Sequence, residues 1–172
     1  MITTRWLTSA VLALLATAGC THLYVPRKIP VEGVEIVGFA SRPSVQLVND
    51  AASSLTLIGS QGVHKWVADF KDWTNVAIEL CSTELAQRNA QIGGDGGKVL
   101  KLSVHRANLI WGFAAIRCIL NLRVETADGR TFEFEGNNAS PLTVYRAMDG
   151  ALSRAVGALL ASPAVRSYLE AH

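Results

Sequence analysis

Two segments of alternating apolar and polar residues, separated by Asp128-Gly129, constrain the fold more than any other feature of the chain. Apolar side chains take every second position in residues 116–126, and residues 130–136 continue the pattern. Such alternation is typical of strands that bury one face, and Asp-Gly between two strands favours a tight hairpin because both residues tolerate positive φ. Residues 98–106 alternate in the same way. We therefore expect three consecutive antiparallel strands, a meander, with one face buried and the other in water.

Two long helices are predicted to flank this meander. The first begins between Trp66 and Lys71 and ends near Gln91, because apolar residues recur there at steps of three and four. The second follows Ser140 and Pro141, which are suited to the cap and to the first helical position. Each helix would place an apolar stripe against the sheet and leave its polar side in water.

Shorter elements complete the expected fold. Strands are predicted at residues 34–39, 44–49 and 54–60, where β-branched residues lie between turn formers. A short last helix is predicted at residues 163–170, after a second Ser-Pro pair. The elements together predict an α+β fold, a two-layer sandwich in which a mainly antiparallel sheet packs against two long helices. Residues 31–172 are expected to form one domain of this kind, with enough chain for a sizeable core.

The first twenty residues have the layout of a secretory signal. Arg5 precedes an uncharged run at residues 6–16, and small residues then lead to Cys20. A run of about 11 residues is too short to span a bilayer, which takes roughly 20 residues. The small pair before Cys20 resembles the lipobox of bacterial lipoproteins. The resemblance implies that residues 1–19 are a signal peptide, that Cys20 carries the lipid, and that residues 20–30 form a lipidated tether.

The order of elements in the mature chain resembles small periplasmic lipoproteins of the YajG type and the auxiliary lipoproteins of ABC-type transport systems. The small size, the lipidated start and the closing helical segment at residues 151–169 carry this resemblance. Thr21 after the lipobox cysteine resembles the pattern of lipoproteins sent to the outer membrane of Gram-negative bacteria. These resemblances imply a non-enzymatic accessory or interaction subunit of envelope assembly or transport, on the periplasmic face of the outer membrane. Its implied contacts are the membrane, through Cys20, and an envelope protein.

The chain has two further cysteines, Cys81 on the first predicted helix and Cys118 on a predicted strand. Disulfides persist in the oxidising compartments outside the cytoplasm, and packing of a helix on a sheet can bring two such sulfurs together. Two separately buried thiols that behave as small apolar residues are the alternative. The sequence leaves both arrangements open.

No pattern in the sequence predicts catalysis. A Gly-x-Ser-x-Gly elbow is absent, the four histidines are scattered without a metal-binding spacing, and the glycine run at residues 92–97 follows a helix, whereas a phosphate loop opens one. Charges are mixed along the chain with a net charge of +2, whereas nucleic acid favours a clustered basic face. We therefore expect no enzyme activity, no cofactor, no metal and no nucleic-acid partner.

One apolar segment stands where a turn is usually polar. Residues 108–116 join two predicted strands and carry Leu109, Ile110, Trp111 and Phe113. If exposed, these side chains form a patch for a partner or ligand; alternatively, they extend the strands and pack under the first helix or the N-terminal segment. A second candidate function is a lipid- or small-ligand-binding module with a groove between the sheet and the helices. The residues expected to line that groove are Trp66, Phe70, Trp111 and Phe113.

Overall fold

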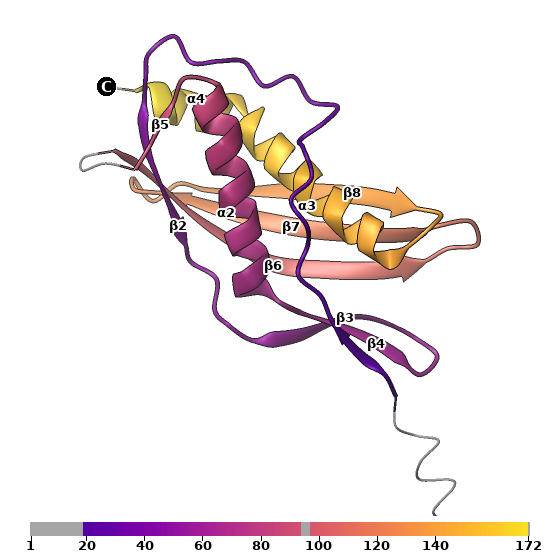
Figure 1. Ribbon diagram of the computed structural model, residues 1–172. Helices are drawn as coiled ribbons and strands as arrows, with labels where there is room; N and C mark the ends of the chain where they lie inside the picture. The colour runs from indigo at the N-terminus through magenta and orange to yellow at the C-terminus, as the bar shows by residue number, and fades with distance from the viewer. Residues whose placement is uncertain (1–18, 94–96, 172) are drawn as a thin grey trace, which may run out of the picture.

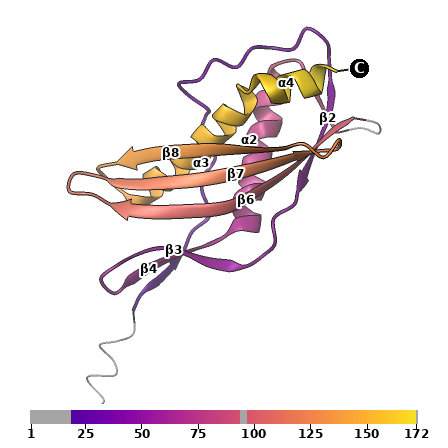
Figure 2. The ribbon, with the colours of Figure 1, turned by 180° about the vertical axis from the view of Figure 1, so that it is seen from behind.

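The computed structural model describes residues 19–93 and 97–171 and confirms the α+β class expected from the sequence (Figure 1). These residues form two sheets and three helices. Two of the helices lie across one face of the larger sheet, and the smaller sheet lies beside one end of it (Figure 1 and Figure 2). The expected signal peptide, residues 1–19, lies outside the described residues except for Gly19.

The larger sheet has five strands in the order β5-β2-β6-β7-β8. The consecutive strands β6 (Lys98–Trp111), β7 (Ile116–Thr126) and β8 (Thr131–Ser140) pair antiparallel. In contrast, β2 (Ser44–Asn49) pairs parallel with β6 and with the short β5 (Gln91–Ile92). The sheet is therefore mixed, whereas the sequence predicts a mainly antiparallel one. The parallel pairing follows from the long connection between β2 and β6, which returns the chain to the same end of the sheet.

The smaller sheet has three strands in the order β1-β4-β3. β3 (Leu55–Gln61) and β4 (His64–Asp69) form a hairpin, and β1 (Thr21–Leu23) pairs parallel with β4. The pairing of β3 with β4 shifts register between Leu57 and Gly59, which is the mark of a β-bulge. This sheet packs against the C-terminal end of β6, where Trp66 and Trp111 have ring centroids 5.1 Å apart.

The three helices are α2 (Phe70–Gln87), α3 (Val144–Leu160) and α4 (Pro163–Glu170). Asp69 caps α2 by accepting a hydrogen bond from the Lys71 N–H at 2.9 Å. The last helix has the predicted bounds and the predicted cap, Ser162. The helix after β8 begins later than predicted and is capped by Thr143. Ser140 does not cap this helix because it is the last residue of β8. Its hydroxyl oxygen accepts hydrogen bonds from the N–H groups of Leu142 and of the cap residue Thr143.

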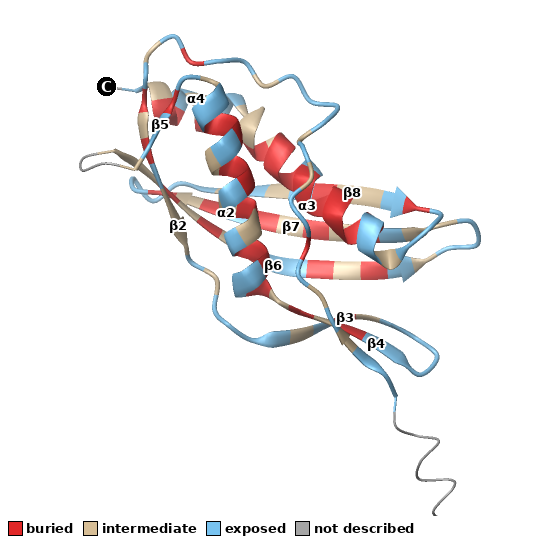
Figure 3. Ribbon diagram, viewed as in Figure 1, coloured by how far each residue is buried: buried red, intermediate tan, exposed pale blue. Residues whose placement is uncertain are grey.

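The core lies between the helices and the larger sheet (Figure 3). Alternate residues of β6 and β7 point into it, and Trp73 of α2 is fully buried among them. α3 crosses β8 at Gly136, where an added Cβ would overlap the carbonyl oxygen of Ala151 and lie 2.7 Å from the N atom of Ala155. Glycine is therefore required at this crossing, because any side chain would push the helix away from the sheet.

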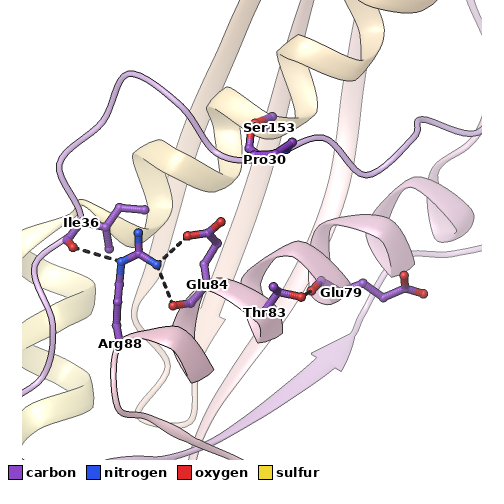
Figure 4. Close-up of polar contacts among 7 residues, drawn as sticks. All are labelled: Pro30, Ile36, Glu79, Thr83, Glu84, Arg88 and Ser153. Carbon is purple, nitrogen blue, oxygen red and sulfur yellow. Dashed lines mark hydrogen bonds and ion pairs between the residues drawn. The ribbon is translucent and has the colours of Figure 1, made fainter.

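The prediction of a strand at residues 34–39 is wrong. Among the described residues this segment pairs with no strand, and it lies against the C-terminal end of α2 and against α4. Arg88 donates its Nε to the Ile36 carbonyl at 3.0 Å and pairs with Glu84 at 2.6 Å (Figure 4), and Arg166 donates to the Gly38 carbonyl at 2.8 Å. Two guanidinium groups thus provide donors that a neighbouring strand would otherwise provide.

The strand β4 is a second departure from the sequence prediction, which places residues 66–69 near the start of a helix. Trp66 and Phe70 stand four residues apart, a spacing that favours a helix, yet Trp66 belongs to β4 and Phe70 to α2. The strand alternates over only six residues, with Trp66 and Ala68 buried. Its partners β1 and β3 bring the long-range pairing that a local pattern does not contain.

Candidate functional site

Cys20 lies directly before β1, at the end of the molecule that carries the smaller sheet (Figure 1). Its side chain is exposed, and its carbonyl oxygen accepts a hydrogen bond from the Lys65 N–H at 2.8 Å. The pairing continues through β1, where Thr21 lies opposite Lys65. The backbone at Cys20 is therefore part of the folded domain.

Residues 24–30, which follow β1, are packed on the helices, whereas the sequence predicts a tether at residues 20–30 that lifts the domain off the membrane. Trp73 donates its Nε1 to the Tyr24 carbonyl at 2.8 Å, and Tyr24 donates its hydroxyl to Asp149 of α3 at 2.7 Å. The same Asp149 oxygen accepts the Arg27 N–H at 2.9 Å. The segment ends where the Ser153 hydroxyl donates to the Pro30 carbonyl at 3.0 Å, a pair drawn in Figure 4. We call residues 24–30 the strap.

The contact of Tyr24 with Asp149 is the polar centre of the strap. Asp149 is buried on α3, and its carboxylate receives both the Tyr24 hydroxyl and the Arg27 backbone. Burial, together with the hydrogen bond to this carboxylate and its negative charge, raises the pKa of the Tyr24 hydroxyl. A buried carboxylate without these donors would be costly, so the strap and α3 stabilise each other.

Four aromatic rings form a cluster at the same end of the molecule. The ring of His22 stacks on His64 and on Trp66, with centroid separations of 5.2 Å in both pairs. The His22 Nε2 and His64 Nδ1 atoms lie 3.0 Å apart, and Trp66 in turn packs on Trp111. The sequence gives no sign of this histidine pair, because β1 and β4 bring together residues that are far apart in the chain. Within residues 19–93 and 97–171, no group of three or more metal-binding side chains is arranged around an ion site.

The apolar segment at residues 108–116 divides between the two interpretations that the sequence allows. Leu109 is buried and Trp111 is half-buried, because both pack against Gly59 of β3. An added Cβ at Gly59 would lie 2.7 Å from the Leu109 Cβ and 2.8 Å from the Trp111 ring, so this close packing depends on glycine. Ile110 is about half exposed, and Phe113 in the β6–β7 turn is fully exposed.

The aromatic residues expected to line a ligand groove do not line one together. Trp66 and Phe70 are buried in the core, whereas Phe113 points away from it. Trp111 is held between Trp66 and Gly59. The Trp111 Nε1 atom is buried and has no hydrogen-bond partner among the described residues. Of these four residues, Phe70 alone lines one of the two hollows described below.

The larger hollow is a groove of about 760 Å³ between the strap and the N-terminal half of α3. Arg27 lies on the strap side, and Arg146 and Arg154 stand on one face of α3 with Gly150 between them. An added Cβ at Gly150 would overlap the side chain of Asn138, so the absence of a side chain keeps this part of the helix close to β8. Three guanidinium groups at one groove give it a basic lining, although Glu32 and Asp149 also contribute carboxylates. The Asp149 carboxylate already accepts hydrogen bonds from Tyr24 and from the Arg27 backbone.

A smaller hollow of about 400 Å³ lies between the loop after β2, Phe70 at the start of α2, and residues of β6 and β7. Charged residues line it, and Lys101 and Glu125 pair across neighbouring strands at 3.1 Å. The hydrogen bond and the negative charge of Glu125 raise the pKa of Lys101. These two charges therefore largely satisfy each other.

Cys81 and Cys118 are free, buried thiols in the structure. Burial raises the pKa of the Cys81 thiol, and the negative charge of the nearby Glu84 carboxylate raises it further. Burial also raises the pKa of the Cys118 thiol, to about 12. A thiol reacts as its thiolate, so both side chains are protected at neutral pH. Cys20 differs from them because its side chain is exposed.

No protein-family model matches the chain, and comparison with curated proteins finds no significant match. None of the helices in the described part of the chain combines the length and the apolar character that a membrane span requires. The geometry around Cys20, the strap and the two hollows is therefore the basis for a functional proposal.

Proposed function

We propose that this protein is a lipid-anchored envelope protein that acts by binding another envelope component. Cys20 is the acylated residue, and the domain after it is an accessory or interaction subunit in envelope assembly or transport. The resemblance of the N-terminus to a lipobox supports the anchor, and Thr21 supports the periplasmic face of the outer membrane of a Gram-negative bacterium. The domain serves as a non-enzymatic binding module.

The position of Cys20 is the observation that carries this proposal. Its side chain is exposed at one extreme of the described chain, and its backbone is hydrogen-bonded to β4. An acyl chain contributes about 0.8 kcal/mol of membrane affinity per buried methylene, so two or more chains on Cys20 hold the protein on a bilayer. The strap then fixes the domain relative to the anchor, because four hydrogen bonds connect residues 24–30 to α2 and α3.

Two variants test the anchor. In cells grown with labelled palmitate, the wild-type chain is expected to take up the label and to fractionate with outer membranes, whereas Cys20→Ala takes up none and loses the membrane association. Cys118→Ala is the matched control, since its sulfur is buried and should leave labelling unchanged. Membrane association of unlabelled Cys20→Ala would contradict the proposal.

The binding role is tested by capture from detergent extracts of envelopes with the acylated protein as bait. We expect an envelope protein to be enriched over a bait that consists of the same anchor on an unrelated domain. Recovery of the same proteins with both baits would contradict the binding role and leave the anchor unaffected.

The basic groove supports a second candidate, a module that binds a lipid or another small anionic ligand. Arg27, Arg146 and Arg154 surround about 760 Å³ of open space, and guanidinium groups suit phosphate and carboxylate groups. Native mass spectrometry of the protein with phosphatidylglycerol tests this function. Arg146→Gln should reduce the bound fraction, whereas Arg123→Gln on the other face of the large sheet should not; equal binding by both variants would refute it.

A further inference from the structure

The outer face of the smaller sheet is apolar and lies beside Cys20. β-strand register places Leu23, Val67 and Leu57 in one row across the three strands. Leu23 is 59% exposed, Leu57 is 56% exposed, and Leu55 on the same face of β3 is 66% exposed. We define the outer face as Leu23, Leu55, Leu57 and Val67.

The two faces of the smaller sheet differ in how far their side chains are buried. The inner face carries Trp66, Ala68 and Ile58, which are buried against the rest of the domain. The outer face has no covering element among residues 19–93 and 97–171, although it carries three exposed leucines. The strand register also places Asp69 opposite Leu55, at the edge of this face. Neighbouring exposed leucines on one sheet face are a feature of interaction surfaces.

The residues next to this apolar row match a lipid surface. The row toward Cys20 contains Thr21, Lys65 and Ser60, so one cation and two hydroxyl groups lie between the leucines and the anchor residue. A cation beside exposed apolar side chains is typical of proteins that lie at a membrane interface, where phosphate groups border the acyl chains. Val63 in the β3–β4 turn is also exposed and lies against Gly19.

From these observations we infer that the outer face rests on the bilayer that holds the acyl chains of Cys20, with its leucines among the lipid headgroups and upper acyl chains. This inference depends on the proposed anchor. Because the Cys20 carbonyl is hydrogen-bonded to β4, an acylated Cys20 keeps this sheet at the membrane surface. The exposed Phe113 is in the β6–β7 turn, which follows the end of β6 that packs on the smaller sheet (Figure 1 and Figure 2).

The orientation of the whole domain follows from this contact. The smaller sheet packs at the C-terminal end of β6, whereas the β7–β8 turn is at the opposite end of the large sheet. The β7–β8 turn and α4 therefore point away from the membrane, and the basic groove opens to the side of α3. A label on the outer face should thus be near lipid, and a label in the β7–β8 turn should be far from it.

Fluorescence quenching in vesicles tests the inference. The acylated full-length product is reconstituted into vesicles of phosphatidylethanolamine and phosphatidylglycerol, with or without lipids brominated on their acyl chains. Bimane is attached at Leu57→Cys or, as a matched control, at Ala127→Cys in the β7–β8 turn. The thiols of Cys81 and Cys118 are buried and should stay unlabelled.

Bromolipids are expected to quench bimane at position 57 and to leave emission at position 127 unchanged. Leu23→Cys is a second site on the outer face and should behave like position 57; circular dichroism verifies that each variant is folded. Vesicle flotation of the same samples separates the two proposals. Protein that floats with vesicles but shows no quenching at positions 23 and 57 would overturn the membrane contact and leave the anchor intact, whereas protein that carries no acyl chain and does not float would overturn both.

Discussion

The hydroxyl of Tyr24 connects the strap to α3, and its removal is expected to destabilise the protein measurably. The Tyr24 hydroxyl lies 2.7 Å from the Asp149 carboxylate, which is buried. A hydrogen bond to a charged group contributes about 1.5–3 kcal/mol, and the lower value applies because Tyr24 is half-buried. For a domain of this size, about 1.5 kcal/mol corresponds to a decrease in Tm of roughly 3–6 °C.

The matched control is the neighbouring tyrosine. The ring of Tyr145 packs on Tyr24 with centroids 4.8 Å apart, but its hydroxyl has no hydrogen bond within the described residues. Thermal unfolding followed by circular dichroism should therefore show a lower Tm for Tyr24→Phe and an almost unchanged Tm for Tyr145→Phe. Equal Tm values for the two variants would show that the strap does not depend on this hydrogen bond.

The same contact predicts a dependence on alkaline pH. The folded state raises the pKa of Tyr24 above the ordinary value of about 10 for tyrosine. The contribution of the Tyr24–Asp149 contact to the free energy of unfolding is therefore fully present below a pH of about 10 and decreases as the pH rises further. The difference in stability between wild type and Tyr24→Phe should shrink above that pH; a constant difference would contradict the assigned charge interaction.

Three further predictions concern the core and the surface. Gly136→Ala should lower the free energy of unfolding by about 3 kcal/mol in chemical denaturation, because the added Cβ would overlap α3. The control Gly38→Ala lies in open surroundings and should change the free energy of unfolding by less than about 0.5 kcal/mol. Similar losses in both variants would refute the close packing of α3 on β8 at Gly136. Cys81 and Cys118 should react with Ellman's reagent only after unfolding, and fast reaction of either in the native protein would contradict their burial. Hydrogen bonds from its neighbours lower the pKa of Asp128 to about 2, so its stabilising effect should disappear as the pH falls from about 4 toward 2. Asp128→Asn should show a weaker acid dependence, and an unchanged acid profile would argue against this contact.

The elements that the sequence predicts well are those whose pattern is local and long. β7 has the predicted bounds because its residues alternate over the whole strand, and α4 has the predicted bounds because Ser162 and Pro163 form an unambiguous helix start. The strand predicted at residues 98–106 extends to Trp111 in β6, because a bulge between Val104 and Arg106 changes which residues face the core and interrupts the alternation. After this bulge, Ala107 and Leu109 continue the buried side of the strand.

The features that the sequence does not predict depend on contacts between distant residues. Residues 34–39 have the composition of a strand, but Arg88 and Arg166 bind their carbonyl groups. The strap reads as a polar linker with two prolines, yet Asp149 lies more than a hundred residues further on and receives two of its hydrogen bonds. The pairing of β1 with β4, which fixes the backbone at Cys20, is of the same kind.

The exposure of the 108–116 segment also depends on a distant residue. Trp111 is half-buried because Gly59 leaves room for its ring, and the bulge in β3 places that glycine beneath it. Phe113 lies two residues further along the chain and is exposed in the described part of the protein. Periodicity alone does not distinguish these two aromatic residues.

The mass of the protein extracted from envelopes tests the central claim most directly. The account predicts a chain that begins at Cys20 and carries the added mass of a diacylglycerol group and an acyl chain on this residue. An extracted chain in which Cys20 has a free thiol, or in which the residues before it are still attached, would contradict the account.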